Sequence, residues 1–164
     1  MKNATLIFLL ILAIVGIGFW AVNNNGGQKT AVKIYFLRSG DVLPVERNVS
    51  AKEDLEKIAV QELLNGPTTK EKEAGYFSQI PKHTRLIKVY REDNIAKVDF
   101  SKDLGKYGGG TETVQGIIAQ IVYTLTEFQG ISKAQILIEG KSVSALGSEG
   151  FVLDKPLSRK DVSK

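Results

Sequence analysis

Residues 111–128 read TETVQGIIAQIVYTLTEF. Apolar side chains recur here at intervals of three and four residues, which is the period of an amphipathic helix, and the stripe lasts for about five turns. A glycine run precedes Thr111, which is placed to cap the helix, and Gly130 is placed to end it. We therefore predict one long central packing helix. The stripe consists of Val114, Ile117, Ile118, Ile121, Val122, Leu125 and Phe128.

Upstream of this helix, the sequence predicts a strand and a second helix. Residues 31–38, AVKIYFLR, alternate between two sets of side chains, as in a strand with one buried face. Ser50 and Glu53 have the spacing of a capping box, in which each side chain satisfies a free backbone N–H at a helix start. A helix with an apolar face should follow and end at Gly66.

The remaining patterns predict a hairpin and a final pair of strands. Residues 68–84 are polar and predict a long connection with one helical turn, which a Thr68–Glu71 capping box begins. Residues 85–91 and 95–100 alternate and predict a β-hairpin, and residues 134–139 predict a strand that turns into a short strand at Val143. The inward side chains of the hairpin should be Ala96, Val98 and Phe100.

The element order is therefore β-α-β-β-α-β-β. Two helices with one apolar stripe each need the apolar face of a common sheet to bury against. We predict an α+β fold, a two-layer sandwich with two helices on one small mixed or antiparallel sheet.

An uncharged, apolar run precedes this domain, from Ala4 to Val22. At about 1.5 Å per residue, it nearly spans a ~30 Å hydrocarbon core. Bulky residues crowd its only candidate cleavage position, Ala21, so we expect an uncleaved anchor, with a cleaved signal peptide as the alternative. We predict a signal-anchor transmembrane helix at 1–22, a linker at 23–30 and an extracytoplasmic domain at 31–164, tethered to the cell membrane by a single pass.

The composition excludes several classes of function. There is no Cys and one His, His83, so we expect no metal site, no cofactor and no thiol nucleophile. The absence of Cys also excludes a lipidated cysteine anchor. The net charge is +4, but 22 basic and 18 acidic residues are interspersed, so no basic stripe is available and nucleic-acid binding is not expected.

Weak candidates for chemistry remain. Gly105 to Gly110 has the glycine spacing of a phosphate loop, but Thr111 and Glu112 follow where such a loop needs Lys and Ser or Thr. Asp99, Asp103 and Glu112 could meet as a carboxylate pair or a cation site. Asp99 falls on the outward face of its strand and Asp103 in a loop, so we expect solvated carboxylates and no catalytic residues.

Polar residues on the other side of the long helix form a candidate partner face. Gln115, Tyr123 and Glu127 lie away from the apolar stripe, and Tyr107 lies on the glycine-rich approach to the helix. Tyrosine is favoured at interfaces because it offers a large area at a low entropy cost. We predict that these four residues contact a partner.

A set of motifs spread over about residues 32–161 resembles the GerMN domain, the sporulation and spore-germination module of bacterial cell-envelope proteins. The motifs are the 32–37 strand, Pro44-Val45-Glu46-Arg47, Leu63-Leu64-Asn65-Gly66-Pro67-Thr68 with Glu71 and Gly75, Ile80-Pro81 with Thr84, Val98-Asp99-Phe100-Ser101, Gln120 to Thr126 with Phe128 and Gly130, Ile138-Glu139-Gly140, and Pro156-Leu157-Ser158-Arg159.

The resemblance implies a non-enzymatic domain displayed outside the cytoplasmic membrane and related in fold to ring-building modules of sporulation channels. This chain departs from the sporulation member, which carries two such domains behind a lipoprotein Cys. The leading hypothesis is a tethered interaction module that binds an envelope protein or self-associates. The alternative is an accessory protein that binds or processes peptidoglycan, with Asp99, Asp103 and Glu112 as its acids.

Overall fold

The long helix of the sequence is α4 (Thr111–Leu125) in the computed structural model, which describes residues 29–50, 54–146 and 151–163. The predicted stripe is buried from Val114 to Leu125. Burial extends beyond this stripe, because Gln120 and Thr124 are also fully buried. Gly110, and not Thr111, occupies the N-cap position. The helix is therefore enclosed on more than one side.

Strands β1 (Lys29–Arg38) and β2 (Asp41–Ser50) form an antiparallel hairpin. Strand β1 was predicted, but β2 was not, because its side chains are only exposed or half-buried and give no strong apolar alternation. Ser50 ends β2, and α2 (Leu55–Asn65) is capped by Asp54, whose side chain accepts hydrogen bonds from the backbone N–H groups of Glu56 and Lys57. The predicted capping box at Ser50 is therefore wrong.

Two other predicted local features are confirmed, but α4 ends at Leu125 and not at Gly130, and Val143 lies outside the strands. Helix α3 (Thr69–Glu73) begins at a capping box in which the Thr68 N–H donates to Glu71 Oε2 at 2.6 Å and the Glu71 N–H donates to Thr68 Oγ1 at 3.3 Å. Strands β3 (Leu86–Glu92) and β4 (Ile95–Phe100) pair antiparallel as the predicted hairpin. The predicted inward residues of β4 are fully buried; they are Ala96, Val98 and Phe100.

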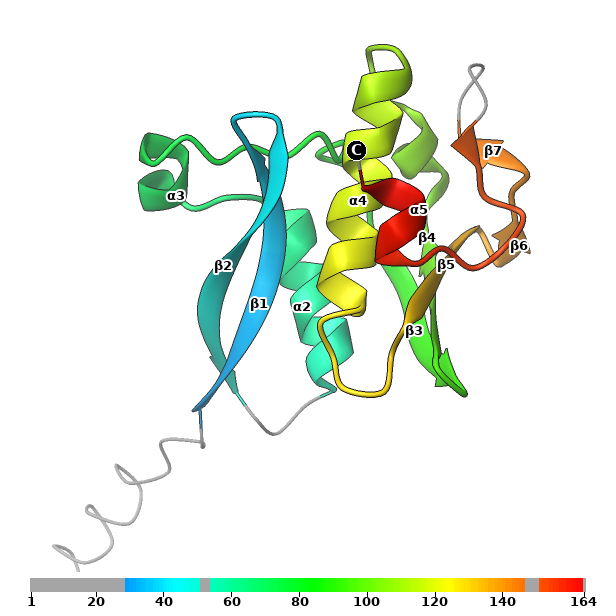
Figure 1. The fold of residues 1–164 in the computed structure, drawn as a ribbon, viewed down its shortest axis with the longest axis horizontal. Helices are drawn as coiled ribbons and strands as arrows, with labels where there is room; N and C mark the ends of the chain where they lie inside the picture. Colours follow the sequence, from blue (N-terminus) through cyan, green and yellow to red (C-terminus); the bar gives the residue numbers. More distant parts are fainter. Residues whose placement is uncertain (1–28, 51–53, 147–150, 164) are drawn as a thin grey trace, which may run out of the picture.

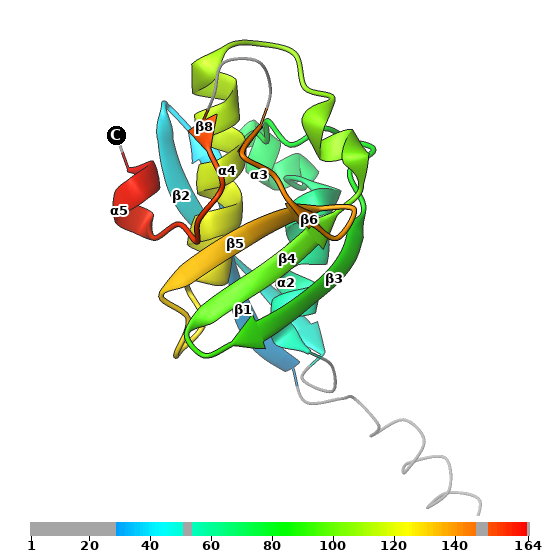
Figure 2. The ribbon, with the colours of Figure 1, turned by 90° about the vertical axis from the view of Figure 1, so that its right-hand side faces the viewer.

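A four-stranded sheet contains β3, β4, β5 (Lys133–Ile138) and β6 (Lys141–Ser142) in that order (Figure 2). Strand β5 runs parallel to β4, and α4 makes the crossover between them. A short helix, η1 (Lys102–Gly105), precedes α4. The C-terminal region, predicted to be mostly irregular, forms the small hairpin β7 (Ala145–Leu146) and β8 (Phe151–Val152) and the helix α5 (Arg159–Val162).

Helices α2 and α4 lie between the two main sheets (Figure 1). Both helices contact β1 on one side, while α2 contacts β3 and α4 contacts β5 on the other. The α+β class is confirmed, but the predicted two-layer sandwich on one common sheet is wrong, as is the element order without β2. The physical reason is that α4 is apolar around most of its circumference and can therefore bury two faces.

The N-terminal predictions fall mainly outside the described residues. The transmembrane helix at 1–22 lies wholly outside them, and strand β1 begins at Lys29, so Lys29 and Thr30 belong to the domain and not to the linker. Within the described ranges, no helix is both long and apolar enough to cross a membrane.

Candidate functional site

The four residues of the candidate partner face have different surroundings. Gln115 and Tyr123 both line a groove beside α4. Tyr107 donates a hydrogen bond from its hydroxyl to the carbonyl oxygen of Leu146 at 3.1 Å and packs against the core. Glu127 belongs to a charged cluster with β1 and α5. A contact between these residues and a partner stays a prediction.

The Glu127 cluster joins three elements that are far apart in the sequence. Its carboxylate accepts hydrogen bonds from Lys33 Nζ at 2.9 Å, from the Tyr35 hydroxyl at 2.7 Å and from Arg159 Nη2 at 2.7 Å. The Arg159 guanidinium lies 5.1 Å from the ring centre of Tyr35 and 4.8 Å from that of Tyr123. The cluster therefore fastens β1 and α5 to the C-terminal end of α4.

These contacts control the ionisation of Glu127. Partial burial on its own raises the pKa of this carboxyl group, but hydrogen bonds from Tyr35, Arg159 and Lys33 oppose burial and lower the pKa from 4.5 to about 2. Because the folded-state pKa is the lower one, the carboxylate stabilises the fold fully above pH 4.5. This contribution is lost as the pH falls from 4.5 toward 2, because the unfolded chain takes up the proton first.

We expect Glu127→Gln to remove this part of the pH dependence. Denaturant unfolding of the full-length chain in detergent, followed from pH 6 to about pH 2.5, should show the difference in unfolding free energy between wild type and variant shrinking below about pH 4.5. Glu73→Gln is the matched control, because Glu73 is exposed on α3 and forms no ion pair with any described residue. A constant gap between Glu127→Gln and wild type over this range would contradict the prediction.

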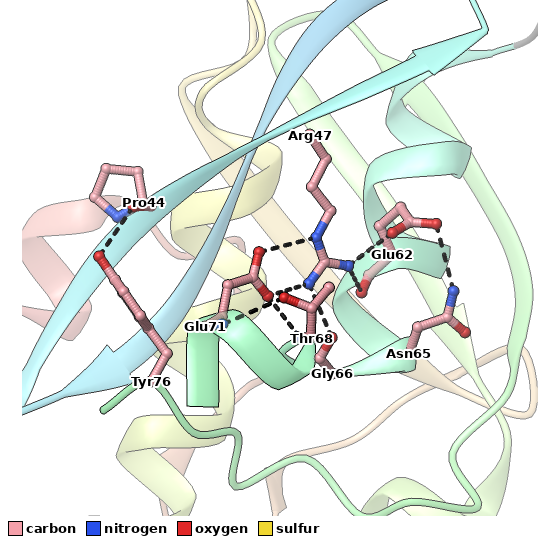
Figure 3. A network of polar contacts seen from close by, with 8 residues as sticks. All are labelled: Pro44, Arg47, Glu62, Asn65, Gly66, Thr68, Glu71 and Tyr76. Carbon is pink, nitrogen blue, oxygen red and sulfur yellow. Dashed lines mark hydrogen bonds and ion pairs between the residues drawn. The ribbon is translucent and has the colours of Figure 1, made fainter. Parts of the chain in front are cut away.

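Arg47 on β2 organises a second polar network (Figure 3). Its guanidinium donates to Glu71 Oε2 and Glu62 Oε2, each at 2.6 Å, and to the carbonyl oxygens of Gly66 at 2.9 Å and Glu62 at 3.1 Å. Its side chain is 11% exposed and lies over the Phe36 ring. The arginine therefore ties β2 to the turn between α2 and α3.

This network explains two motifs of the sequence at once. Arg47 comes from one motif, and Gly66, Thr68 and Glu71 come from another. Figure 3 shows Gly66 and Glu71 in contact with the Arg47 guanidinium, and Thr68 in contact with Glu71. Burial opposes the positive charge on Arg47, yet hydrogen bonds to the two carboxylates raise its pKa above the ordinary value. Each donor direction is occupied within the domain, so the network holds the hairpin in place.

The hairpin groove lies between the tip of the β1–β2 hairpin, the segment around Phe77, α4 and the C-terminal end of α5. Its volume is about 460 Å³. Phe77 is held at the hairpin by two backbone hydrogen bonds to Leu37, of 2.9 and 3.0 Å. The groove is lined by Leu37, Gly40, Asp41, Val42, Leu43, Phe77, Gln79, Glu112, Gln115, Gly116, Ala119, Tyr123, Val162 and Ser163.

The floor of the groove depends on a glycine. A Cβ atom at Gly116 would lie 1.8 Å from Gln79 Oε1 and 3.0 Å from Leu37 Cδ1, so no side chain fits there while Gln79 keeps its position. Gln79 Oε1 is buried and has no hydrogen-bond partner among the described residues. Gly116 therefore allows the 77–79 segment to lie directly on α4.

The three candidate acids differ in their surroundings. Asp99 was predicted on an outward face, but it is 7% exposed, because the β5–β6 turn covers it and the Gly140 N–H donates to its Oδ1 at 2.9 Å. Asp103 pairs with Lys106 at 2.8 Å, and this hydrogen bond lowers the pKa of Asp103. Glu112 is exposed and lines the hairpin groove.

Over the described ranges, no group of three or more His, Asp or Glu side chains could hold a metal ion. His83 is exposed in a loop, as predicted.

Sequence reasoning missed the groove. Leu43 and Phe77 supply its exposed apolar side chains, yet they come from a weakly patterned strand and from the polar 68–84 connection. The available signal was one large apolar residue in each of these two segments. Nothing in the local pattern indicates that the two segments meet.

Comparison with known proteins agrees with this architecture. The family model "Germane: Sporulation and spore germination" matches residues 33–144. The spore germination protein GerM of Bacillus subtilis (strain 168) is 29% identical over 120 residues, which are 73% of this chain and 31% of that protein. This chain therefore spans about a third of the length of that relative.

Solved structures show the same fold. The tandem GerMN domains of the sporulation protein GerM from Bacillus subtilis superpose with a TM-score of 0.69 at 24% identity, over 82% of this chain and 48% of that one. The first GerMN domain of the same protein superposes with a TM-score of 0.62 at 25% identity, over 80% of this chain and 98% of that one. A putative lipoprotein from Clostridium perfringens superposes with a TM-score of 0.60 at 25% identity, over 81% of this chain and 89% of that one.

The matched region runs from β1 through β6 and therefore includes the Arg47 network, α4 and most of the hairpin groove. The predicted resemblance is thus confirmed by the family model, by a related sequence and by three solved structures. This chain belongs to the Germane (GerMN) family of sporulation and spore-germination domains.

Proposed function

We propose that this chain is a membrane-tethered, non-catalytic binding domain of the bacterial cell envelope, which acts outside the cytoplasm in sporulation or spore germination. Family membership and the similarity to GerM support the process. The uncharged run from Ala4 to Val22 supports the tether. Tethering raises the effective concentration near neighbouring envelope proteins, so a weak binding surface is sufficient.

The observation that carries the binding role is the hairpin groove. Two polar side chains of the long helix region are used internally, since Thr124 Oγ1 accepts the Tyr35 N–H at 3.1 Å and Glu127 is held by its cluster. Leu43 and Phe77, by contrast, remain 36% and 45% exposed at the groove. A hollow surface that combines open apolar side chains with a few polar groups is typical of a binding site.

The test is photocrosslinking of the full-length chain in cell membranes. A photoreactive residue at Phe77 or Gln115 should capture one and the same envelope protein, identified by mass spectrometry. Ile87 on β3 is the matched control, because it is apolar, 50% exposed and outside the groove lining, and it should not capture that protein.

Other outcomes would contradict parts of the proposal. Capture of the same protein at Ile87 as at the groove positions would contradict the role of the groove. Recovery of the chain in the soluble fraction would contradict the tether. Adducts with peptidoglycan fragments alone would replace the protein-binding role with the wall-binding alternative.

A further inference from the structure

The groove lining points to the chemistry of its occupant. We infer that the hairpin groove binds a peptide segment of a partner protein in which apolar side chains stand next to Lys or Arg. This inference rests on the proposed function, because it names the class of ligand for the same groove.

The apolar part of the groove lining is mainly aliphatic. Among the described residues, the exposed large hydrophobic side chains are Leu43, Phe77 and Ile87, and the first two line this groove. Burying such side chains against a ligand removes apolar area from water, which favours binding. A volume of about 460 Å³ is within the ~300–1,000 Å³ range of binding pockets. The remaining apolar lining is Leu37, Val42, Ala119 and Val162.

The charges in the lining have one sign. Asp41 and Glu112 are both exposed, and neither forms an ion pair with any described residue. No Lys or Arg lines the groove, although the chain has a net charge of +4. Glu112 also lies in the first turn of α4, where the helix dipole favours a negative charge. A ligand with a cation at this rim would find electrostatic complementarity.

A glycan strand fits this lining less well. Sugar rings bind on open aromatic faces, and of the two aromatic side chains in the lining, Phe77 and Tyr123, Phe77 is 45% exposed. The Tyr123 ring is already in contact with Tyr35, at 5.4 Å between ring centres, and with Arg159 at 4.8 Å. Aliphatic walls with an acidic rim match a basic, apolar peptide better, as in other grooves that bind peptides by their apolar side chains.

The test is selection from a random peptide library displayed on phage, with the full-length chain held in lipid nanodiscs. Selected peptides should be enriched in Leu, Ile, Val or Phe together with Lys or Arg. Empty nanodiscs remove peptides that bind the lipid. Binding of a selected synthetic peptide should weaken with added salt, because the rim charges are exposed.

Three variants separate the contributions to binding. Glu112→Lys should weaken binding roughly three- to tenfold and flatten the salt dependence. Phe77→Ser should weaken binding at all salt concentrations by about tenfold or more. Ile87→Ser is the matched control and should bind as wild type. Unchanged far-ultraviolet circular dichroism confirms that each variant is folded.

The outcomes distinguish this inference from the proposed function. The inference would be overturned if the selection enriched acidic peptides or enriched no peptides. It would also be overturned if peptide binding survived both Glu112→Lys and Phe77→Ser. Binding of a disaccharide-peptide wall fragment with loss in Phe77→Ser would assign the groove to a glycan. If photocrosslinking at Gln115 still captures one envelope protein while the selection fails, the proposed function stands and only the ligand class is wrong.

Discussion

Ile121→Asp is expected to abolish cooperative unfolding of the domain. Ile121 is fully buried in the middle of α4, between the two sheets. A carboxylate placed there has neither water nor a cation, and burying it costs several kcal/mol, against a typical total stability of about 5–15 kcal/mol. Thermal and denaturant unfolding of the full-length chain in detergent, followed by circular dichroism, measures the effect.

The matched control is the same change on an open surface. Ile87→Asp replaces an isoleucine that is 50% exposed on β3, and it should change the unfolding free energy by less than about 1 kcal/mol. If Ile121→Asp unfolded as sharply as wild type and at the same midpoint, the assignment of α4 as the centre of the core would be wrong.

Arg47→Met should have the second largest effect on stability and should lower the unfolding free energy by about 3–5 kcal/mol. Methionine keeps an apolar stem beside Phe36 but removes every donor of the guanidinium. The carboxylates of Glu62 and Glu71, and two backbone carbonyl oxygens, then lose their partner in a half-buried position. Removing one member of such a buried pair costs more than the pair contributes, because the other charge stays behind.

Arg91→Met is the matched control for this network. Arg91 pairs with Glu56, but its side chain is 42% exposed, and an exposed ion pair contributes no more than about 1 kcal/mol. Combining Arg47→Met with Glu71→Gln should recover part of the lost stability, since the second change removes the stranded charge. Equal effects at positions 47 and 91 would mean that the network does not hold β2 to the helices.

Local sequence patterns were sufficient to predict the elements whose residues have a clear period or motif spacing. The α4 stripe, the β3–β4 hairpin and the Thr68–Glu71 capping box were all predicted from residues within a few positions of each other. Each of these depends on a period or a spacing that the backbone geometry imposes directly. Strand β2 lacks such a signal, because no residue in it is fully buried, and it was missed.

The sequence by itself determined the α+β class, the central helix and membership in the GerMN family, because these follow from periodicity and from motifs that are contiguous in the chain. Only the tertiary structure decided that α4 lies between two sheets, that Asp99 is buried, that Glu127 is held by Lys33 and Arg159, and that Leu43 and Phe77 border one groove. Periodicity shows which side of an element is apolar. It does not show how many layers cover that side, or which distant residue supplies the opposite charge, because both depend on how separate segments pack together.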